Sequence, residues 1–392
     1  MRSDAIVIGA GIIGAACAHA LARSGLSVTV IEEKAAASGT SGQGEGNLLV
    51  SDKGPGAELE LARYSLGLWD EIEDQLRERL PRGFGSMEYE RKGGLVVATT
   101  ADGAAPLLRF AEDQQQAGVD ARPIDHDQAL ELEPHVNPEI TAAVHYPEDA
   151  QVQPVIATEA LLAAARSHGA RTIFGERVIG SVRGADDKII GVRTTAGVRR
   201  AELVVLACGP WAADVAESLG TWIPVRPRRG VILVTTRMPH RIFHKVYDAD
   251  YVGAVESDDQ DLQTSSVIES TAAGTVLVGS SRRQSGFDTA LDLPSVREIA
   301  RKAVRIFPFL AEAAVMRVYG GFRPFMPDHL PVIGPDPRID GLWHAGGHEG
   351  AGIGLSLGTA EMLTDLIMGR RPAIDHTPFD PARPSLLEGA AR

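Results

Sequence analysis

The sequence predicts an α/β fold in which a doubly wound nucleotide-binding domain is interleaved with a second, largely antiparallel β-sheet domain. The first observation is a strand, a glycine-rich turn, an Ala-rich helix and a second strand within residues 4–32. This is the βαβ unit of a parallel sheet. The second observation is that apolar strands ending in glycine recur near residues 206 and 345. Strand-rich blocks separate these segments, so the two domains alternate along the chain.

The elements of the first unit follow from local residue patterns. Residues 4–9 contain the apolar run Ala-Ile-Val-Ile, which predicts a strand buried on both faces. The next helix ends near Ser24, because Gly25 stands where a helix C-cap glycine is expected. Residues 26–32 are rich in β-branched side chains and predict a second strand. Six glycines between residues 38 and 56 predict a long loop.

The remaining elements are expected from apolar periodicity and from β-branched runs. Helices are expected at residues 58–80, 104–118, 154–168 and 293–307. Strands are expected at residues 87–100, 171–174, 178–183, 189–195, 201–207, 231–236, 247–255, 266–269 and 276–280. A last strand at 342–345 leads through a glycine-rich turn into a helix that ends near Met368.

This order of elements predicts two interleaved domains and not two consecutive ones. A Rossmann-like nucleotide-binding domain is expected from residues 1–83, 150–220 and 322–375. A substrate domain is expected from residues 84–149 and 221–321, followed by a C-terminal tail at residues 376–392.

Composition excludes several classes of function. The net charge of −13, with no block of like charges, argues against nucleic acid or an anionic membrane as a partner. Two cysteines make a disulfide framework improbable and favour a cytoplasmic protein. No CxxC or HExxH spacing occurs, so no metal site is expected. No run of eighteen apolar residues occurs, so no membrane span is expected.

The motif Gly9-x-Gly11-x-x-Gly14 lies between the first strand and its helix, with Ile12 and Ile13 inside it. Its glycines allow a tight turn, a close approach of the backbone to a pyrophosphate, and close packing of helix on strand. The alternative is a glycine-rich turn that only packs.

An acidic residue, Glu32, ends the second strand and is followed by Glu33. An acid at this place is suited to the ribose hydroxyls of a dinucleotide, and it argues against a ligand with a 2′-phosphate.

Two further glycine-rich segments favour FAD over NAD. They are residues 40–49 (TSGQGEGNLL) and 346–354 (GGHEGAGIG). Each offers backbone amides without bulky side chains, as the edges of a flavin ring require. A helix that begins near Gly350 would direct its positive end at the ring and stabilise charge on the reduced flavin. The alternative for the second segment is a plain helix-entry loop.

Taken in order, five motifs resemble the D-amino-acid oxidase family of flavoproteins, in particular its glycine oxidase and sarcosine oxidase branch. They are GxGxxG with Glu32, the loop GTSGQGEGNLL, the strand end LACGPW, the segment GGFRP followed by PVIG, and GGHEGAG. The resemblance covers residues 4–370. The version of the loop around Glu45 is also similar to subunits of opine and hydroxyproline dehydrogenases and of hydrogen cyanide synthase.

The resemblance implies a Rossmann-like FAD-binding domain and a role for each matching residue. Gly9, Gly11 and Gly14 would hold the pyrophosphate and Glu32 the adenosine ribose. Thr40 and Ser41 would approach the phosphates, and the backbone of Val178 would meet adenine. Residues near the flavin ring would include Gly46, Asn47, Leu48, Cys208, Gly209, Trp211, Gly347, His348, Glu349, Gly350, Gly352 and Ile353. No cysteine or histidine stands where relatives attach flavin covalently, so non-covalent FAD is expected.

Arg323 matches the family arginine that binds the carboxylate of the substrate. A planar guanidinium suits this task, because it donates two parallel hydrogen bonds. The alternative is a structural arginine paired with a nearby acid such as Asp328. Tyr247 and Tyr251 are candidates for substrate contact, although a tyrosine in the core or at an interface fits the pattern equally well.

The function expected is oxidation of the carbon–nitrogen bond of glycine or an N-substituted amino acid. Arg323 would hold the carboxylate, hydride would pass to flavin N5, and the resulting imine would hydrolyse to a carbonyl compound and an amine. The electron acceptor is either O₂ or a redox partner, so a dehydrogenase subunit is the main alternative. A non-catalytic nucleotide-binding module is a third reading. Neither the exact substrate nor a homo-oligomeric state follows from the sequence.

Overall fold

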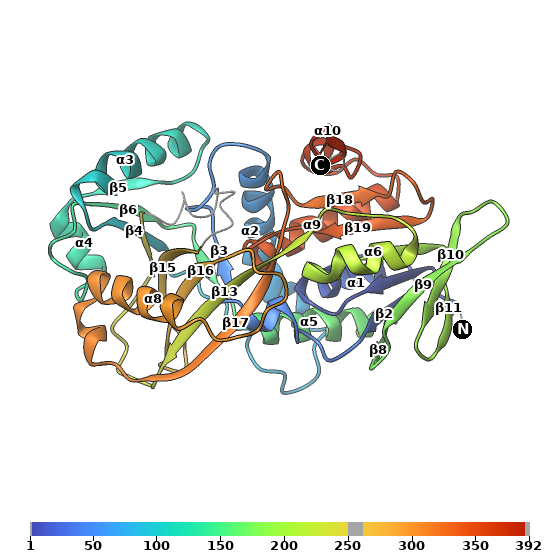
Figure 1. Ribbon diagram of the computed structural model, residues 1–392, viewed down its shortest axis with the longest axis horizontal. Coiled ribbons are helices and arrows are strands. Elements are labelled where there is room, and N and C mark those ends of the chain that lie inside the picture. Colours follow the sequence, from blue (N-terminus) through green and yellow to red (C-terminus); the bar gives the residue numbers. More distant parts are fainter. Residues whose placement is uncertain (1, 250–261, 389–392) are drawn as a thin grey trace.

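The computed structural model describes residues 2–249 and 262–388 and divides into two lobes (Figure 1). A six-stranded sheet organises one lobe, in the order β18-β19-β12-β1-β2-β8. Its strands are β1 (Ala5–Ile8), β2 (Val28–Glu32), β8 (Arg171–Phe174), β12 (Leu203–Leu206), β18 (Val332–Pro335) and β19 (Leu342–Gly346). All neighbouring pairs are parallel except β18 with β19. The predicted βαβ unit is therefore confirmed.

Both faces of this sheet are covered, which explains why its strands are continuously apolar. Ala5 and Val7 of β1 face one core, into which α1 (Ile12–Arg23), α5 (Pro154–Ser167) and α9 (Gly352–Ile367) pack. Ile6 and Ile8 face a second core, which is formed with α6 (Ala212–Leu219) and a three-stranded sheet. That sheet contains β9 (Val178–Arg183), β10 (Ile189–Thr194) and β11 (Gly197–Arg200).

An eight-stranded sheet organises the other lobe, in the order β17-β13-β16-β15-β14-β4-β6-β5. Its pairs are antiparallel except β14 with β4. The strands are β4 (Gly94–Ala98), β5 (Arg122–Ile124), β6 (Ala142–Tyr146), β13 (Arg226–Thr235), β14 (Lys245–Asp248), β15 (Gln263–Ser270), β16 (Val276–Arg282) and β17 (Val315–Phe325). The α8 helix (Leu293–Ile306) packs on it, and α3 (Ala101–Gln116) and α4 (His126–Leu132) lie at its outer end (Figure 1).

The longest contact in this sheet joins β13 and β17 from Arg226↔Phe325 to Thr235↔Val315. Sequence reasoning missed β17, because glycines and arginines interrupt its apolar pattern. The predicted domain boundary at residues 321/322 falls inside this strand, and the other boundaries remain predictions. The α2 helix (Ala57–Leu76) lies between the two lobes in Figure 1, and the short strands β3 (Asn47–Leu48) and β7 (Ala150–Gln151) pair with each other.

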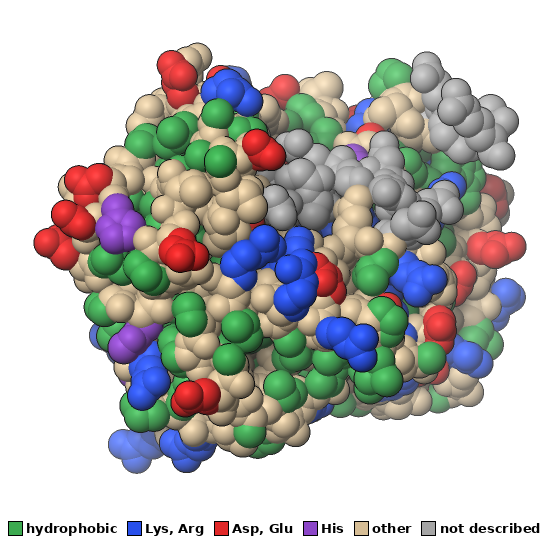
Figure 2. All heavy atoms as spheres, turned by 60° about the vertical axis from the view of Figure 1, so that its left-hand side comes forward, with side chains coloured by type: hydrophobic (Ala, Val, Ile, Leu, Met, Phe, Trp, Pro, Cys, Tyr) green, Lys and Arg blue, Asp and Glu red, His purple; other side chains and the backbone are tan. Residues whose placement is uncertain are grey.

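The outer surface mixes charge types. On the face shown in Figure 2, acidic and basic side chains both occur among apolar and polar ones. Within the described ranges, none of the helices combines the length and apolar character needed to span a bilayer.

Candidate active site

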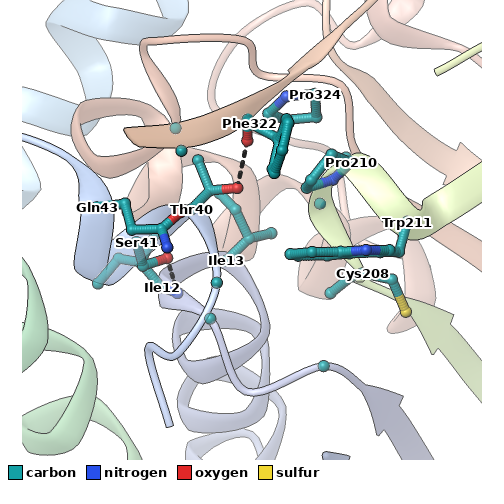
Figure 3. Close-up of a pocket in the computed structure, with 18 of the residues that line it drawn as sticks. Ile12, Ile13, Thr40, Ser41, Gln43, Cys208, Pro210, Trp211, Phe322 and Pro324 are labelled. Atoms are coloured by element: carbon teal, nitrogen blue, oxygen red, sulfur yellow. Dashed lines mark hydrogen bonds between the residues drawn. The ribbon is translucent and has the colours of Figure 1, made fainter. Parts of the chain in front are cut away.

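One cavity brings together segments of both lobes that are far apart in sequence. It is lined by the turn after β1, the end of β2, the loop at residues 38–47, the end of β12, strands β13 and β17, and the turn before α9. Figure 3 shows part of this cavity, with Thr40 and Ser41 on one side and Cys208, Pro210 and Trp211 on the other. Most of the residues that the sequence proposes for the site converge here.

The glycine motif forms one end of the cavity. Gly9 has a φ of +106°, and a Cβ on Gly14 would lie closer than 3.0 Å to the Gly9 carbonyl oxygen. Only glycine therefore allows this turn and this packing of α1 on β1. Gly9, Gly11, Ile12 and Ile13 line the cavity, whereas Gly14 lies behind the turn. The arrangement leaves the N-terminus of α1 directed at the cavity.

Glu32 stabilises the same turn. Its carboxylate accepts hydrogen bonds of 2.9 Å from the backbone N–H groups of Ala10 and Lys34. A carboxylate has further lone pairs, so these two bonds leave acceptor capacity for a ligand. Glu33 and Val178 line the cavity beside Glu32.

The loop at residues 40–47 is held from both sides. Thr40 Oγ1 donates to the backbone carbonyl of Phe322 over 2.6 Å, and Ser41 Oγ accepts from Ile12 N–H over 2.9 Å (Figure 3). Ser41 thus satisfies the first N–H of α1, whose own N-cap residue, Gly11, has no side chain to do so. Gly46 has a φ of +84° and lies against the Val152 carbonyl, so its path also requires glycine.

Cys208, Gly209 and Trp211 form the wall opposite this loop. Cys208 Sγ donates to the carbonyl of Ile8 over 3.3 Å, and burial raises the pKa of this thiol. The indole ring of Trp211 stacks on Phe287 with 5.7 Å between ring centroids. The thiol is therefore a packing group, and the indole is a rigid rim of the cavity.

The turn before α9 forms the far end. His348, Glu349, Gly350, Gly352 and Ile353 line the cavity there. The imidazole of His348 is buried and bonds Thr359 Oγ1 over 2.9 Å, and burial lowers its pKa to about 3. Because its pKa is so low, this histidine is neutral at physiological pH and does not act as a proton acceptor.

Glu349 is held in a left-handed conformation, with a φ of +46°. Its carboxylate accepts a 2.5 Å hydrogen bond from Arg228, whose side chain is fully buried. His329 and Arg228 lower the pKa of Glu349 against the opposing effect of burial. The pair fixes the turn at the far end of the cavity to the eight-stranded sheet.

Arg323 enters the cavity from β17. Its Nη1 donates to the Ser281 carbonyl over 2.8 Å, and its side chain passes over Gly230 of β13. The acid offered as its alternative partner, Asp328, is instead bound by Arg383 at 2.6 and 2.9 Å. The structure therefore places Arg323 in the cavity wall, as the sequence predicts.

Several predicted residues lie elsewhere. Leu48 is buried in the core, and Gly347 lies against Met326 outside the cavity lining. Tyr247 is 1% exposed within the core and is not part of the described lining. Tyr251 lies outside the described residues. Of the two described residues proposed to contact substrate, the structure brings Arg323 to the cavity but not Tyr247.

Many lining residues were missed, among them two polar side chains of the glycine-rich loop. Gln43 and Glu45 both line the cavity on the loop before β3. An acidic side chain inside a glycine-rich loop was the available signal, but the loop was interpreted only through its backbone amides.

The family model described as "DAO: FAD dependent oxidoreductase" matches residues 4–366. The chain is 29% identical to the hydrogen cyanide synthase subunit HcnC of Pseudomonas aeruginosa, over 97% of this chain and 96% of the relative. It is also 29% identical to the glycine oxidase of Geobacillus kaustophilus, over 97% of each chain. The crystal structure of glycine oxidase from Geobacillus kaustophilus superposes with a TM-score of 0.87, at 28% identity over 97% of this chain and 99% of that one.

Proposed function

This chain belongs to the DAO family of FAD-dependent oxidoreductases, and we propose that it oxidises the carbon–nitrogen bond of glycine or an N-substituted amino acid. The products would be a carbonyl compound and an amine, formed when water hydrolyses an imine. The observation that carries this proposal is the position of Arg323, an arginine in the wall of the cavity that FAD would share.

The cavity suits FAD on its own geometry. Gly9 and Gly11 line the cavity at the N-terminus of α1, where a pyrophosphate would lie, and Glu32 lines it where the adenosine ribose would lie. Thr40 and Ser41 would border the phosphates, and the turn at residues 346–353 would border the ring. Bound FAD supplies the two-electron acceptor that the oxidation requires. We propose that it is held without a covalent bond.

Arg323 would position the substrate. Its guanidinium can bind a carboxylate through two parallel hydrogen bonds, which fixes orientation as well as charge. Ile232, Phe322 and Pro324 give the cavity wall near it an apolar surface. A carboxylate held here would place its α-carbon at one fixed site, which is the main catalytic requirement when the cofactor carries out the redox chemistry.

The relatives also support a second candidate. HcnC is named as a subunit of a synthase, and the structure of L-proline dehydrogenase from P. horikoshii superposes with a TM-score of 0.85 at 25% identity over 99% of this chain. The first name supports a partner chain, and the second, a dehydrogenase, supports an electron acceptor other than O₂. The same amine oxidation would then feed a partner chain.

An anaerobic titration tests the proposal. Purified protein is supplied with FAD, and N-methylglycine, glycine, iminodiacetate and D-proline are added while the visible flavin bands are recorded. Bleaching by at least one of them is the expected result, and acid precipitation should release free FAD. No bleaching by any carboxylated amine would overturn the proposal. Re-oxidation by air, compared with re-oxidation by a dye only, separates the oxidase from the dehydrogenase candidate.

A further inference from the structure

Glu45 is an acidic residue inside the same cavity as Arg323. It lies between η1 (Thr40–Gln43) and β3, on a loop whose path Gly46 constrains. Its Oε1 is buried and accepts no hydrogen bond within residues 2–249 and 262–388. A buried, unsatisfied carboxylate oxygen is costly unless a ligand satisfies it.

Three glycines of the eight-stranded sheet make room for the polar side chains of the cavity. A Cβ on Gly279 of β16 would lie closer than 3.0 Å to Glu45 Oε1. A Cβ on Gly230 of β13 would lie equally close to Arg323 Nη1, and one on Gly321 of β17 would lie 2.8 Å from Gln43 Oε1. The order of these strands is β17-β13-β16. The three glycines therefore form a floor on which the guanidinium of Arg323 and the carboxylate of Glu45 both lie.

The two charges lie along the same strand, β16. The carboxylate of Glu45 lies over Gly279, and Arg323 donates to the carbonyl of Ser281, two residues further along. Arg323 is also among the cations whose charge acts on Glu45, so both groups belong to one part of the cavity. A short zwitterion suits this pair of opposite charges, with its carboxylate on Arg323 and its ammonium on Glu45.

The surroundings of Glu45 tune its basicity. Burial raises its pKa, while the charges of Lys245 (β14), Arg323 (β17) and Arg282 (β16) and a hydrogen bond from Asn47 (β3) oppose this shift. Tyr319 of β17 also faces it, and Lys245 forms an ion pair with Glu269. A carboxylate with a raised pKa is a better proton acceptor than a solvated one, yet the cations keep an anionic form accessible.

We propose that Glu45 binds the amino group of the substrate opposite Arg323 and accepts one proton from it. This inference rests on the proposed function. In the step, one N–H bond of the ammonium breaks and an O–H bond forms on Glu45, which leaves a lone pair on nitrogen. That lone pair becomes the C=N bond as the α-hydrogen leaves with its electron pair to the flavin. The substrate class is then an amino acid whose nitrogen carries a proton, and 2-hydroxy acids and quaternary ammonium acids are excluded.

Glu45→Gln removes the proton acceptor and retains the shape of the side chain. With N-methylglycine as the probe, the rate of flavin reduction at low substrate concentration is measured anaerobically against pH. The wild type should vary with pH much less steeply than the variant up to about pH 9, because Glu45 takes the proton. The variant must use the free neutral amine, so its rate should rise about tenfold per pH unit. Glu312→Gln, at an exposed site, is the matched control and should follow the wild type.

A second variant and a second readout guard against a folding defect. Gly279→Ala keeps the charge of Glu45 but displaces its carboxylate, and should reproduce the pH dependence of Glu45→Gln. An indicator dye in wild-type protein should report no proton released when N-methylglycine binds, because Glu45 retains it.

The outcomes separate this inference from the proposed function. A wild type that no amino acid reduces overturns both. A wild type that is reduced, but that releases one proton per bound substrate or shares its pH dependence with Glu45→Gln, overturns the role of Glu45 alone.

Discussion

The guanidinium of Arg323 occupies the space above Gly230 on the neighbouring strand. The two strands are paired so that Gly230 faces Gly321, and a Cβ at Gly230 would lie closer than 3.0 Å to Arg323 Nη1 and within 2.8 Å of Cζ. The position of Arg323 thus depends on the absence of a methyl group at Gly230. Gly230 lies two residues from Arg228, which pairs with Arg323 across the two strands.

Gly230→Ala should therefore impair substrate binding without removing any functional group. Displacing the guanidinium by about 1 Å is expected to lower the efficiency of flavin reduction about 100-fold. The measurement is anaerobic reduction by an amino acid substrate, together with the dissociation constant for FAD, which should stay unchanged. Gly67→Ala, at an exposed site in α2, is the control. Equal efficiency of flavin reduction in Gly230→Ala and Gly67→Ala would contradict this dependence of Arg323 on Gly230.

Replacing Arg323 itself tests the charge and the hydrogen bonds separately. Arg323→Ala should raise the KM for carboxylated amines about 10- to 100-fold, because charge-assisted hydrogen bonds are lost. Arg323→Lys keeps the charge but not the two parallel hydrogen bonds, so its KM should lie between those of the wild type and of Arg323→Ala. A substrate analogue with a methyl group in place of the carboxylate should react equally with all three proteins. A loss on that analogue too would mean that Arg323 has a structural role.

Much of the fold could be predicted, because buried parallel strands carry a strong local signal. The βαβ unit around Gly9 and Glu32 combines an apolar strand, a glycine turn and an acid at fixed spacing. The β17 strand gave no such signal, since glycines and arginines interrupt its apolar pattern and part of it lines the cavity. Gly321, one of the glycines that hide this strand from sequence reasoning, also makes room for Gln43 in the cavity.

The site was predictable where a motif and a backbone requirement coincide. Thr40, Ser41 and Gly46 are brought to the cavity as expected, because the loop can follow only one path. Glu45 could not be predicted, since its importance depends on Gly279, which is more than 200 residues away and contacts it only in the folded sheet. Tyr247 was predicted to contact substrate but is buried in the core. A tyrosine has both an apolar ring and a polar hydroxyl, so its residue type does not tell which face of a strand it occupies.

Glu32 links the glycine turn to cofactor affinity. Glu32→Gln keeps the size of the side chain but replaces one of the two oxygens that accept from Ala10 and Lys34. The dissociation constant for FAD should rise about tenfold, as for loss of one charge-assisted hydrogen bond. Titration of apoprotein with FAD, followed by quenching of flavin fluorescence, measures it. Glu217→Gln, exposed on α6, should bind FAD as the wild type does, and the same affinity in Glu32→Gln would argue that the carboxylate has no role in binding.

Ser41 supports the same end of the cavity from a distant loop. Ser41→Ala removes the acceptor for Ile12 N–H and leaves the first donor of α1 without its partner. The free energy of unfolding should fall by about 1 kcal/mol, as for loss of a helix cap. Ser218→Ala, whose hydroxyl donates to a carbonyl on the surface of α6, is the control and should change stability less. Urea unfolding of both variants with FAD present makes the comparison.

The buried imidazole of His348 should make the free energy of unfolding depend on pH. Burial lowers its pKa to about 3 in the folded protein, against an ordinary value of 6.5. Between these values the unfolded chain binds more protons than the native one, so stability falls as pH decreases below 6.5. At pH 5 the loss from this residue should be about 2 kcal/mol.

His348→Gln cannot titrate, so its free energy of unfolding should decrease about 2 kcal/mol less than that of the wild type between pH 7.5 and 5. Urea unfolding of the FAD-saturated proteins measures this, because all other titrations are shared and cancel. His240→Gln, at an exposed site, should retain the full loss of the wild type, and the same loss in His348→Gln would mean that the imidazole is not buried in its neutral form.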